Sequence, residues 1–413
     1  MFRKTRITSI SLTVMITSLI VWGANAVRSP YLSIASEMQN SFQTVTPPHK
    51  AEDSALVSSP CMNALAQHAV CITANKRSLE VMNANRLKAI IVVQDVRTGA
   101  LVAFAASHPS ELDVTTPVGP LSLSKVLLSA SWWDNRQPDS SFDSTKGSPN
   151  AQNPAYRSRV TVHEMLVGGS DSAGRQLAVA LRRSVGTKKV LEDFARYGFG
   201  RRTGLLQDDK FWGEQAPPWK ARLIPVPAYV SLSEETKDGE WAETLSLGEI
   251  NISLTALHIS RFLQAVGNNG VMLTPVAREE QSTPSVTKSA VSRRDFNNSI
   301  RVMQESTALR LQSAMCDTVQ RGTAKSIAKT LEDTGWQIGG KTGSGPALLP
   351  KGDLVDGWFA GLVFDPQGKA RFTVVTFVRS GGYGGENAAK ISAELARYII
   401  GGQPRSVVNN RRF

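Results

Sequence analysis

Apolar runs near both ends of the chain predict the strands of a sheet. Residues 89–93 are continuously apolar, and a polar turn ending in Gly separates them from a second apolar run at 101–104. Near the C-terminus, residues 357–364 and 372–379 flank an Asp-Pro-Gln-Gly turn. Short apolar runs joined by turn residues are typical of hairpins with buried strands. The pattern therefore predicts one hairpin at each end of a folded domain.

The sequence between the hairpins has a helical pattern. Apolar residues recur at helical spacing in the stretches 127–133, 162–167, 173–184, 188–197, 254–266 and 307–320, and the stretch 388–400 predicts a closing helix. Strands at both ends with helices between them predict the α+β class, with a central antiparallel sheet that joins the N- and C-terminal segments. The polar stretches 134–159, 206–240 and 276–300 are expected to be loops or insertions.

The first 30 residues have the pattern of an export signal. Three cations in residues 1–6 precede a mostly apolar run, 7–22, and a small-x-small site at Ala24-Asn25-Ala26. This order is typical of a cleaved secretory signal. The apolar segment 7–27 is also about as long as a bilayer is thick, so an uncleaved membrane anchor fits equally well. Both alternatives predict that the rest of the chain is extracytoplasmic, in the periplasm or at the outer face of the cytoplasmic membrane.

The charge of the chain is positive but dispersed. There are 47 Lys and Arg against 35 Asp and Glu, a net charge of +12. No tract interleaves cations with aromatic residues as a nucleic-acid platform would, so we expect no nucleic-acid partner. An anionic envelope polymer or membrane surface is the better match for the excess of cations. Hydrophobic residues at 41% allow a sizeable core and exclude global disorder.

The three cysteines predict one disulfide in an exported chain. Cys61 and Cys71 are the expected pair, and Cys316 lies in an apolar helical pattern that favours a structural thiol over a nucleophile. The sequence contains neither C-x-x-C nor H-E-x-x-H, so it predicts no metal site.

Two lysine motifs carry candidate chemistry. Ser122 and Lys125 form an S-x-x-K at the start of a helical pattern, where i and i+3 side chains share a face. A desolvated lysine can then take the proton of the serine. The second motif, Lys341-Thr342-Gly343, follows the strand-like stretch 336–338 and can hold a carboxylate beside an extended substrate. Residues 335–342 also fit the P-loop pattern, but Pro346 prevents the helix that a P-loop requires.

A third motif, Ser170-Asp171-Ser172, lies between these two. A serine beside a Ser/Lys pair can relay a proton to a leaving group. The same serine at the start of a helical pattern also fits a helix N-cap, which is the commoner role of such a residue.

The order of the three motifs resembles that of the penicillin-binding transpeptidases and their serine β-lactamase relatives. Four further segments resemble the family in the same order: 92–100, 194–204, 246–255 and 356–361. The resemblance implies a β-lactamase-like or transpeptidase-like fold with a helical subdomain. It divides the chain into four parts. These are a signal or anchor at 1–30, a linker with a short N-terminal segment at 31–85, a transpeptidase domain at 86–400 and a basic tail at 401–413. Residues 31–85 are too few for a glycosyltransferase or pedestal domain, so we expect a single transpeptidase domain.

The resemblance implies a role for each motif residue. Ser122 would be the acyl-forming nucleophile, Lys125 its base and Ser170 the proton shuttle. The substrate-binding residues would be Ser172, Lys341, Thr342, Gly343 and Ser344. Among these, Lys341 and Thr342 would hold the carboxylate of a D-alanyl-D-alanine stem peptide or a β-lactam. The N–H groups of Ser122 and Ser344 would form the oxyanion hole, and no cofactor is implied.

The chain departs from the family pattern at several of these positions. Ser172 replaces the usual asparagine of the second motif, and Leu121 replaces the glycine that usually precedes the nucleophile. Val126 stands where the family often has a proline, and Ile250 stands where it usually has a glycine. Three functions therefore stay open: a D,D-transpeptidase or D,D-carboxypeptidase of peptidoglycan, a catalytically impaired scaffold in a cell-wall complex, and a β-lactam-binding protein that hydrolyses or senses the drug. The absence of an E-x-x-L-N segment between the second and third motifs argues against efficient hydrolysis.

Overall fold

The protein is described by a computed structural model over residues 88–106, 112, 116–144, 159–199, 229–277, 299–346 and 355–401. All of these belong to the unit Glu52–Phe413. The expected signal or anchor, the linker, the Cys61/Cys71 pair and the basic tail beyond Gly401 lie outside the described residues. Predictions about those segments therefore stay predictions.

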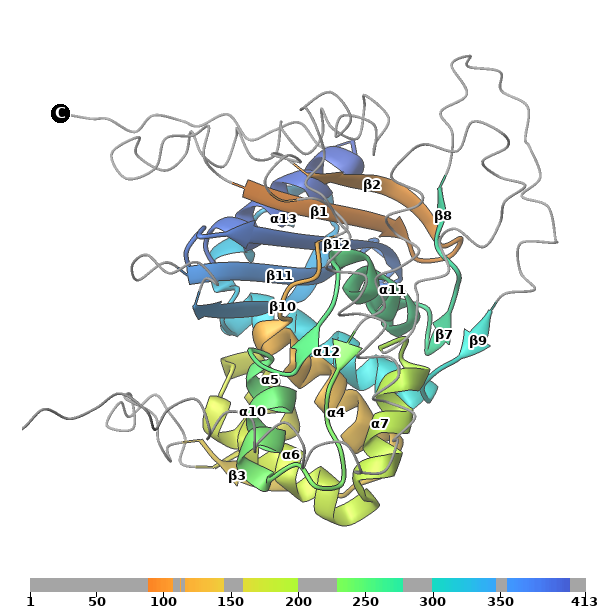
Figure 1. Ribbon diagram of the computed structural model, residues 1–413. Helices are drawn as coiled ribbons and strands as arrows, with labels where there is room; N and C mark the ends of the chain where they lie inside the picture. The colour runs from red at the N-terminus through yellow and green to blue at the C-terminus, as the bar shows by residue number, and fades with distance from the viewer. Residues whose placement is uncertain are drawn as a thin grey trace, which may run out of the picture. The chain divides into compact units, whose positions relative to one another are not determined.

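A six-stranded sheet joins the two ends of the domain (Figure 1). Its order is β10-β11-β12-β1-β2-β8, with bounds Gln337–Pro346, Val355–Phe364, Ala370–Arg379, Lys88–Asp95, Ala100–Ala106 and Val276–Ala277. β1 from the N-terminal hairpin pairs antiparallel with β12 from the C-terminal hairpin, with Val92 opposite Val375. The predicted sheet is confirmed, and the short β8 adds a parallel pairing with β2. As far as the sheet is described, β10 is an edge strand.

Both faces of the sheet are buried. Along β1, Ile90 and Val92 belong to the larger hydrophobic cluster, and Ile91 and Val93 belong to the smaller cluster on the other face. Helix α11 (Ala256–Gly267) contributes to the larger cluster and α13 (Asn387–Ile399) to the smaller one, and both pack against β12. Burial on both faces explains why residues 89–93 of β1 are continuously apolar instead of alternating.

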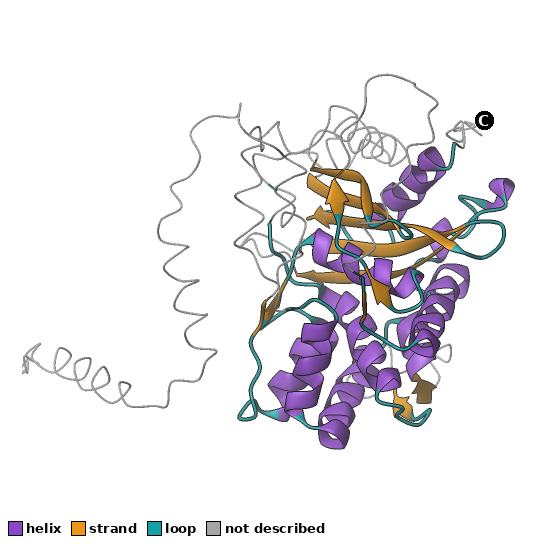
Figure 2. Ribbon diagram, turned by 90° about the vertical axis from the view of Figure 1, so that its right-hand side faces the viewer, coloured by secondary structure: helices purple, strands orange, loops and turns teal. Residues whose placement is uncertain are grey.

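A group of helices lies below the sheet in both views (Figure 1 and Figure 2), and Figure 1 labels its members. They are α4, α5, α6, α7, α10 and α12, with bounds Ser124–Asp134, Val162–Gly168, Asp171–Val185, Thr187–Arg196, Asp238–Leu247 and Glu305–Arg321. Short elements complete the described fold: η3 (Leu121–Leu123), β3 (Ser141–Asp143), β4 (Arg159–Thr161), β5 (Tyr229–Val230), β6 (Ile252–Ser253), β7 (Val271–Met272), β9 (Ile300–Arg301), η6 (Lys325–Ile327) and η7 (Glu332–Thr334). No helix in the described ranges is both long and apolar enough to cross a membrane.

One helix was not predicted. α10 begins inside a stretch expected to be a loop, because its first turn is polar and contains Gly239. Its buried face is built around Trp241, whose indole N–H donates to the Ala178 carbonyl of α6 at 3.0 Å. Tertiary packing against α6 therefore compensates for a weak local helical signal.

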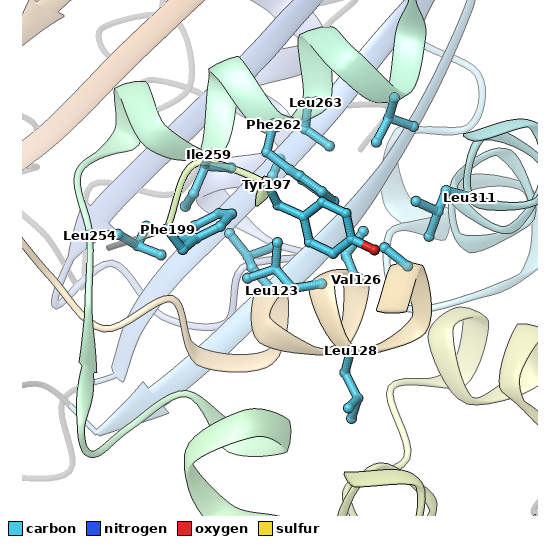
Figure 3. Packing of buried hydrophobic residues seen from close by; sticks show 14 of the residues in the cluster. Leu123, Val126, Leu128, Tyr197, Phe199, Leu254, Ile259, Phe262, Leu263 and Leu311 are labelled. Carbon is cyan, nitrogen blue, oxygen red and sulfur yellow. The ribbon is translucent and has the colours of Figure 1, made fainter. Parts of the chain in front are cut away.

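The core fixes the helix that carries the first lysine motif (Figure 3). Leu123 at the end of η3 and Val126 in the first turn of α4 are buried in a cluster with Ile259 and Phe262 of α11 and with Phe199. Burial of an aliphatic side chain of this size contributes roughly 1.5–3 kcal/mol. These buried contacts anchor the start of α4 in the core, and Ser122 directly precedes Leu123 in the chain.

Candidate active site

The first motif brings a serine and a lysine into contact. Ser122 lies in η3, and Lys125 lies in the first turn of α4, so the two side chains are on the same side of the chain. The Lys125 Nζ donates to Ser122 Oγ at 2.8 Å. This distance permits direct proton transfer between the hydroxyl and the amine.

Lys125 is fully buried and has two further hydrogen-bond partners. Its Nζ donates to Asp171 Oδ1 and to the Ser246 carbonyl, each at 2.8 Å. Burial lowers the pKa of Lys125 below its ordinary value, and the Asp171 carboxylate opposes that effect. Desolvation therefore moves this amine toward the neutral form that a general base requires.

The residue before the nucleophile has an unusual backbone conformation. Leu121 has a φ of +53°, in the left-handed region that favours glycine. Its N–H donates to the Gly248 carbonyl at 3.1 Å, and a Cβ at Gly248 would clash with the Leu121 carbonyl. Close backbone contact thus holds a leucine where the resemblance leads one to expect glycine. The strain lies next to Ser122, where such conformations often accompany function.

The three residues of the second motif have three different environments. Ser170 is the N-cap of α6, and its Oγ accepts from the Ala173 N–H at 3.3 Å. Asp171, the next residue, provides the carboxylate that contacts Lys125. The Ser172 hydroxyl donates to the Asp143 carbonyl of β3 at 2.8 Å, so it points to that strand. The position where the resemblance implies an asparagine thus bonds α6 to β3.

A glycine allows α6 to approach the lysine closely. A Cβ at Gly174 would lie 3.0 Å from Lys125 Cε and 3.1 Å from Ser246 Cβ. Glycine in a helix interior costs roughly 0.5–1 kcal/mol relative to alanine. The close packing around Lys125 gives a physical reason for a glycine at this position.

The third motif lies on the edge strand β10. Lys341 is almost fully buried, and its Nζ donates to the Thr342 carbonyl at 3.0 Å. Burial, together with the nearby Lys125, lowers the pKa of Lys341 to about 7. The hydroxyls of Thr342 and Thr323 lie 2.6 Å apart. A Cβ at Gly169 would lie 3.6 Å from Lys341 Nζ, which places the α5–α6 turn beside this amine.

Close contacts join β10 to the nucleophile segment. A Cβ at Gly343 would lie 3.1 Å from Trp358 Cβ and 3.2 Å from the Pro120 carbonyl. The Trp358 indole N–H of the neighbouring strand β11 donates to the Gly119 carbonyl at 2.9 Å. On β10 itself, Ser344 Oγ accepts from the Gly384 N–H at 2.9 Å. The structure thus brings the segment before Ser122 against the edge strand that carries Lys341-Thr342-Gly343-Ser344.

Three residues of this site had no assigned role in the sequence analysis. They are Asp171, Ser246 through its carbonyl, and Thr323. Asp171 lies inside a motif that was recognised, but residue spacing does not determine which of three neighbouring side chains turns toward Lys125. Ser246 acts through its backbone, which any residue type could supply. Thr323 precedes the third motif in a segment without a recognisable pattern.

The described residues contain no cluster of three or more His, Cys, Asp or Glu side chains placed to hold a metal ion. Cys316 is half-buried on α12 and packs against the larger hydrophobic cluster. Burial raises the pKa of its thiol to about 11, which disfavours the reactive thiolate.

Comparison with known proteins identifies the family. Residues 89–400 match the transpeptidase domain of penicillin-binding proteins. The chain belongs to the penicillin-binding protein transpeptidase family. It is 24% identical over 345 residues to penicillin-binding protein PbpB of Mycolicibacterium smegmatis and 24% identical over 289 residues to PbpB of Mycobacterium tuberculosis. These matches include 75% and 63% of this chain but only 49% and 38% of the two relatives.

Solved structures of the family have the same fold. The apo transpeptidase domain of penicillin-binding protein 3 from Burkholderia pseudomallei aligns with a TM-score of 0.60 at 15% identity, over 87% of this chain and 100% of that domain. Penicillin-binding protein 3 from M. tuberculosis, in complex with aztreonam, aligns with a TM-score of 0.56 at 18% identity, over 84% of this chain and 80% of that structure. The predicted α+β transpeptidase fold with its helical subdomain is therefore confirmed.

Proposed function

We propose that this penicillin-binding protein is a D,D-transpeptidase of peptidoglycan that acts through an acyl-enzyme on Ser122. The contact between Ser122 Oγ and the buried Lys125 Nζ, at 2.8 Å, carries the proposal. A serine next to a desolvated amine has an internal acceptor for its proton. The family membership of the chain supports the same chemistry.

In the first half-reaction, Lys125 takes the Ser122 hydroxyl proton while Oγ attacks the carbonyl carbon of the penultimate D-alanine. The tetrahedral oxyanion would be held by the Ser122 and Ser344 N–H groups, and one such donor is typically worth about 3–4 kcal/mol. The C–N bond then breaks, and the proton passes from Lys125 to the leaving amine, with the Ser170 hydroxyl as the expected relay. In the second half-reaction, an acceptor amine attacks the ester carbonyl and gives its proton to Lys125. The bond between the acyl carbon and Ser122 Oγ then breaks, and Lys125 returns the proton to Ser122. With water as the acceptor, the same steps describe a D,D-carboxypeptidase.

Lys341 and Thr342 are the proposed binding site for the terminal carboxylate of the substrate. They lie on the edge strand β10, along which an extended peptide can pair with the backbone. A β-lactam carries a carboxylate and a reactive amide, so it would bind in the same way, and its leaving nitrogen would stay attached. Exported peptidoglycan stem peptides and β-lactams are therefore the proposed ligands. Export or anchoring through residues 1–30, and association with other cell-wall proteins, remain part of this proposal.

Acylation by a fluorescent penicillin, read by intact mass, tests the proposal. We expect one adduct on the wild-type protein and none on Ser122→Ala. Ser129→Ala is a matched control, because Ser129 lies on α4 and its buried hydroxyl has no hydrogen-bond partner within the described residues. This variant should keep both the fold and the adduct. Absence of an adduct on a folded wild-type protein would refute the enzyme proposal.

A scaffold without acylation is the second candidate. Its support is the Ser172 hydroxyl, which bonds to β3 where the family usually presents an asparagine to the lysine and substrate. The two candidates differ in the same experiment, because a scaffold would keep the fold without forming the adduct.

A further inference from the structure

The second motif presents a carboxylate to the base. Asp171 Oδ1 lies 2.8 Å from Lys125 Nζ, and Lys125 Nζ lies 2.8 Å from Ser122 Oγ. Asp171 is the first residue of α6, where the helix dipole favours a negative charge. The Ser170 cap and the bond from Ser172 to β3 fix this turn on both sides of Asp171. The carboxylate is therefore held by the fold in contact with the amine.

The hydrogen bonds of Lys125 show what this contact does. A neutral amine has two N–H donors and one lone pair. Two of its three partners, the Asp171 carboxylate and the Ser246 carbonyl, can only accept hydrogen bonds. When both N–H groups are used in this way, the lone pair faces the third partner, the Ser122 hydroxyl. Asp171 thus contributes to aiming the basic electron pair at the nucleophile.

We propose that Asp171 is a positioning residue that orients Lys125 toward Ser122 and stabilises the ammonium formed when Lys125 takes the serine proton. The inference rests on the proposed acyl-enzyme function. Nucleophile, base and orienting carboxylate then form a Ser122–Lys125–Asp171 array, in which the third group acts through the second. Among the described residues, the hydrogen bond of the Asp171 carboxylate goes to Lys125, so its role is positioning.

The charge of Asp171 affects the pH dependence of acylation through the pKa of Lys125. The charged groups that affect Lys125 are Asp171 and Arg175 of α6, Glu249 after α10, and Lys341 of β10. The carboxylates favour the ammonium form of Lys125, and the two cations favour the neutral amine. Removing the Asp171 charge should therefore lower the pKa of Lys125, so that the amine acts as a base at lower pH.

Two substitutions separate charge from orientation. Asp171→Asn keeps an oxygen acceptor for Lys125 and removes the charge, and Asp171→Ala removes both. The acylation rate at saturating fluorescent penicillin, where the titration of Lys341 does not limit binding, is measured from about pH 6 to about pH 10. For Asp171→Asn, we expect the rising limb of the plot of acylation rate against pH to move to lower pH by about one unit. This shift is at the low end of the effect of a nearby opposite charge, because the Asp171 side chain is 55% exposed and water screens its charge. The high-pH rate of Asp171→Asn should stay within a few-fold of wild type, whereas Asp171→Ala should acylate about tenfold or more slowly than Asp171→Asn at every pH.

Asp139→Asn is the matched control, because Asp139 pairs with Arg310 at an exposed site after the C-terminal end of α4. It should leave the profile unchanged. An Asp171→Asn profile that coincides with wild type, or an Asp171→Ala variant that acylates as fast as Asp171→Asn at high pH, would overturn the inference.

Titration of the Lys125 side chain by NMR, with ¹³C at Cε, distinguishes this inference from the proposed function. The resonance is assigned by its loss in Lys125→Met, and its midpoint should fall by about one pH unit in Asp171→Asn. If the wild type forms no adduct but the midpoint falls, the enzyme proposal fails and the electrostatic pairing stands. If the midpoint does not move, the inference fails whether or not the protein acylates.

Discussion

Binding of a penicillin before acylation should weaken as the pH rises through about 7, the pKa to which burial lowers Lys341. Only the ammonium form of Lys341 can form a charge-assisted hydrogen bond with the ligand carboxylate. A bound anion stabilises that ammonium and raises its pKa. Affinity is therefore full below the pKa of the free protein and declines above it.

The size of the effect follows from the titration of Lys341. An amine with a pKa of about 7 is about 90% protonated at pH 6, about 10% at pH 8 and about 1% at pH 9. The dissociation constant should therefore rise about tenfold between pH 6 and pH 8, and up to about 100-fold by pH 9. An exposed lysine, with a pKa near 10.4, would give almost no change over this range. A tenfold change in the dissociation constant between pH 6 and pH 8 is therefore expected only if the carboxylate is bound by a buried lysine such as Lys341.

Fluorescence anisotropy with the Ser122→Ala variant measures this binding without acylation. The methyl ester of the same penicillin is the matched ligand, because it lacks the negative charge and should bind with little dependence on pH between 6 and 9. Lys341→Met should remove the pH dependence of the parent drug. If the dissociation constant of the parent drug stays constant over this range, or rises equally for the ester, Lys341 is not the carboxylate anchor.

Two further substitutions test the packing around the site and the core. Gly174→Ala should reduce the acylation rate about tenfold by displacing Lys125 and Ser246 by a few tenths of an ångström. The melting temperature should stay the same or rise, because alanine has the better helix propensity. An unchanged rate would show that Lys125 has more room than the structure describes. Asp193→Ala should reduce the free energy of unfolding by roughly 3 kcal/mol in urea denaturation, because this fully buried carboxylate accepts from Ser131 Oγ at 2.7 Å and from the side chains of Lys189 and Arg196. A loss below about 1 kcal/mol would mean that water replaces these hydrogen bonds.

Local sequence patterns were sufficient to predict the elements whose own residues have a clear hydrophobic pattern. The strands β1, β2, β11 and β12 are largely apolar because both faces of the sheet are buried, and turn residues separate the two strands of each hairpin. α10 lacks such a signal, since its first turn is polar and its position depends on the packing of Trp241 against α6. Sequence patterns therefore fail where long-range contacts, and not local preference, decide the structure.

The sequence by itself determined the reactive pair at the site. Ser122 and Lys125 meet because a spacing of three places them on one side of the turn formed by η3 and the start of α4. The amino-acid order also specified the family, since the three motifs occur in the family's order. Only the tertiary structure decided the pKa values and the hydrogen-bond partners of those groups. Desolvation depends on what packs around an amine, so neither the lowered pKa of Lys341 nor the contact of Asp171 with Lys125 can be deduced from residue types and spacing.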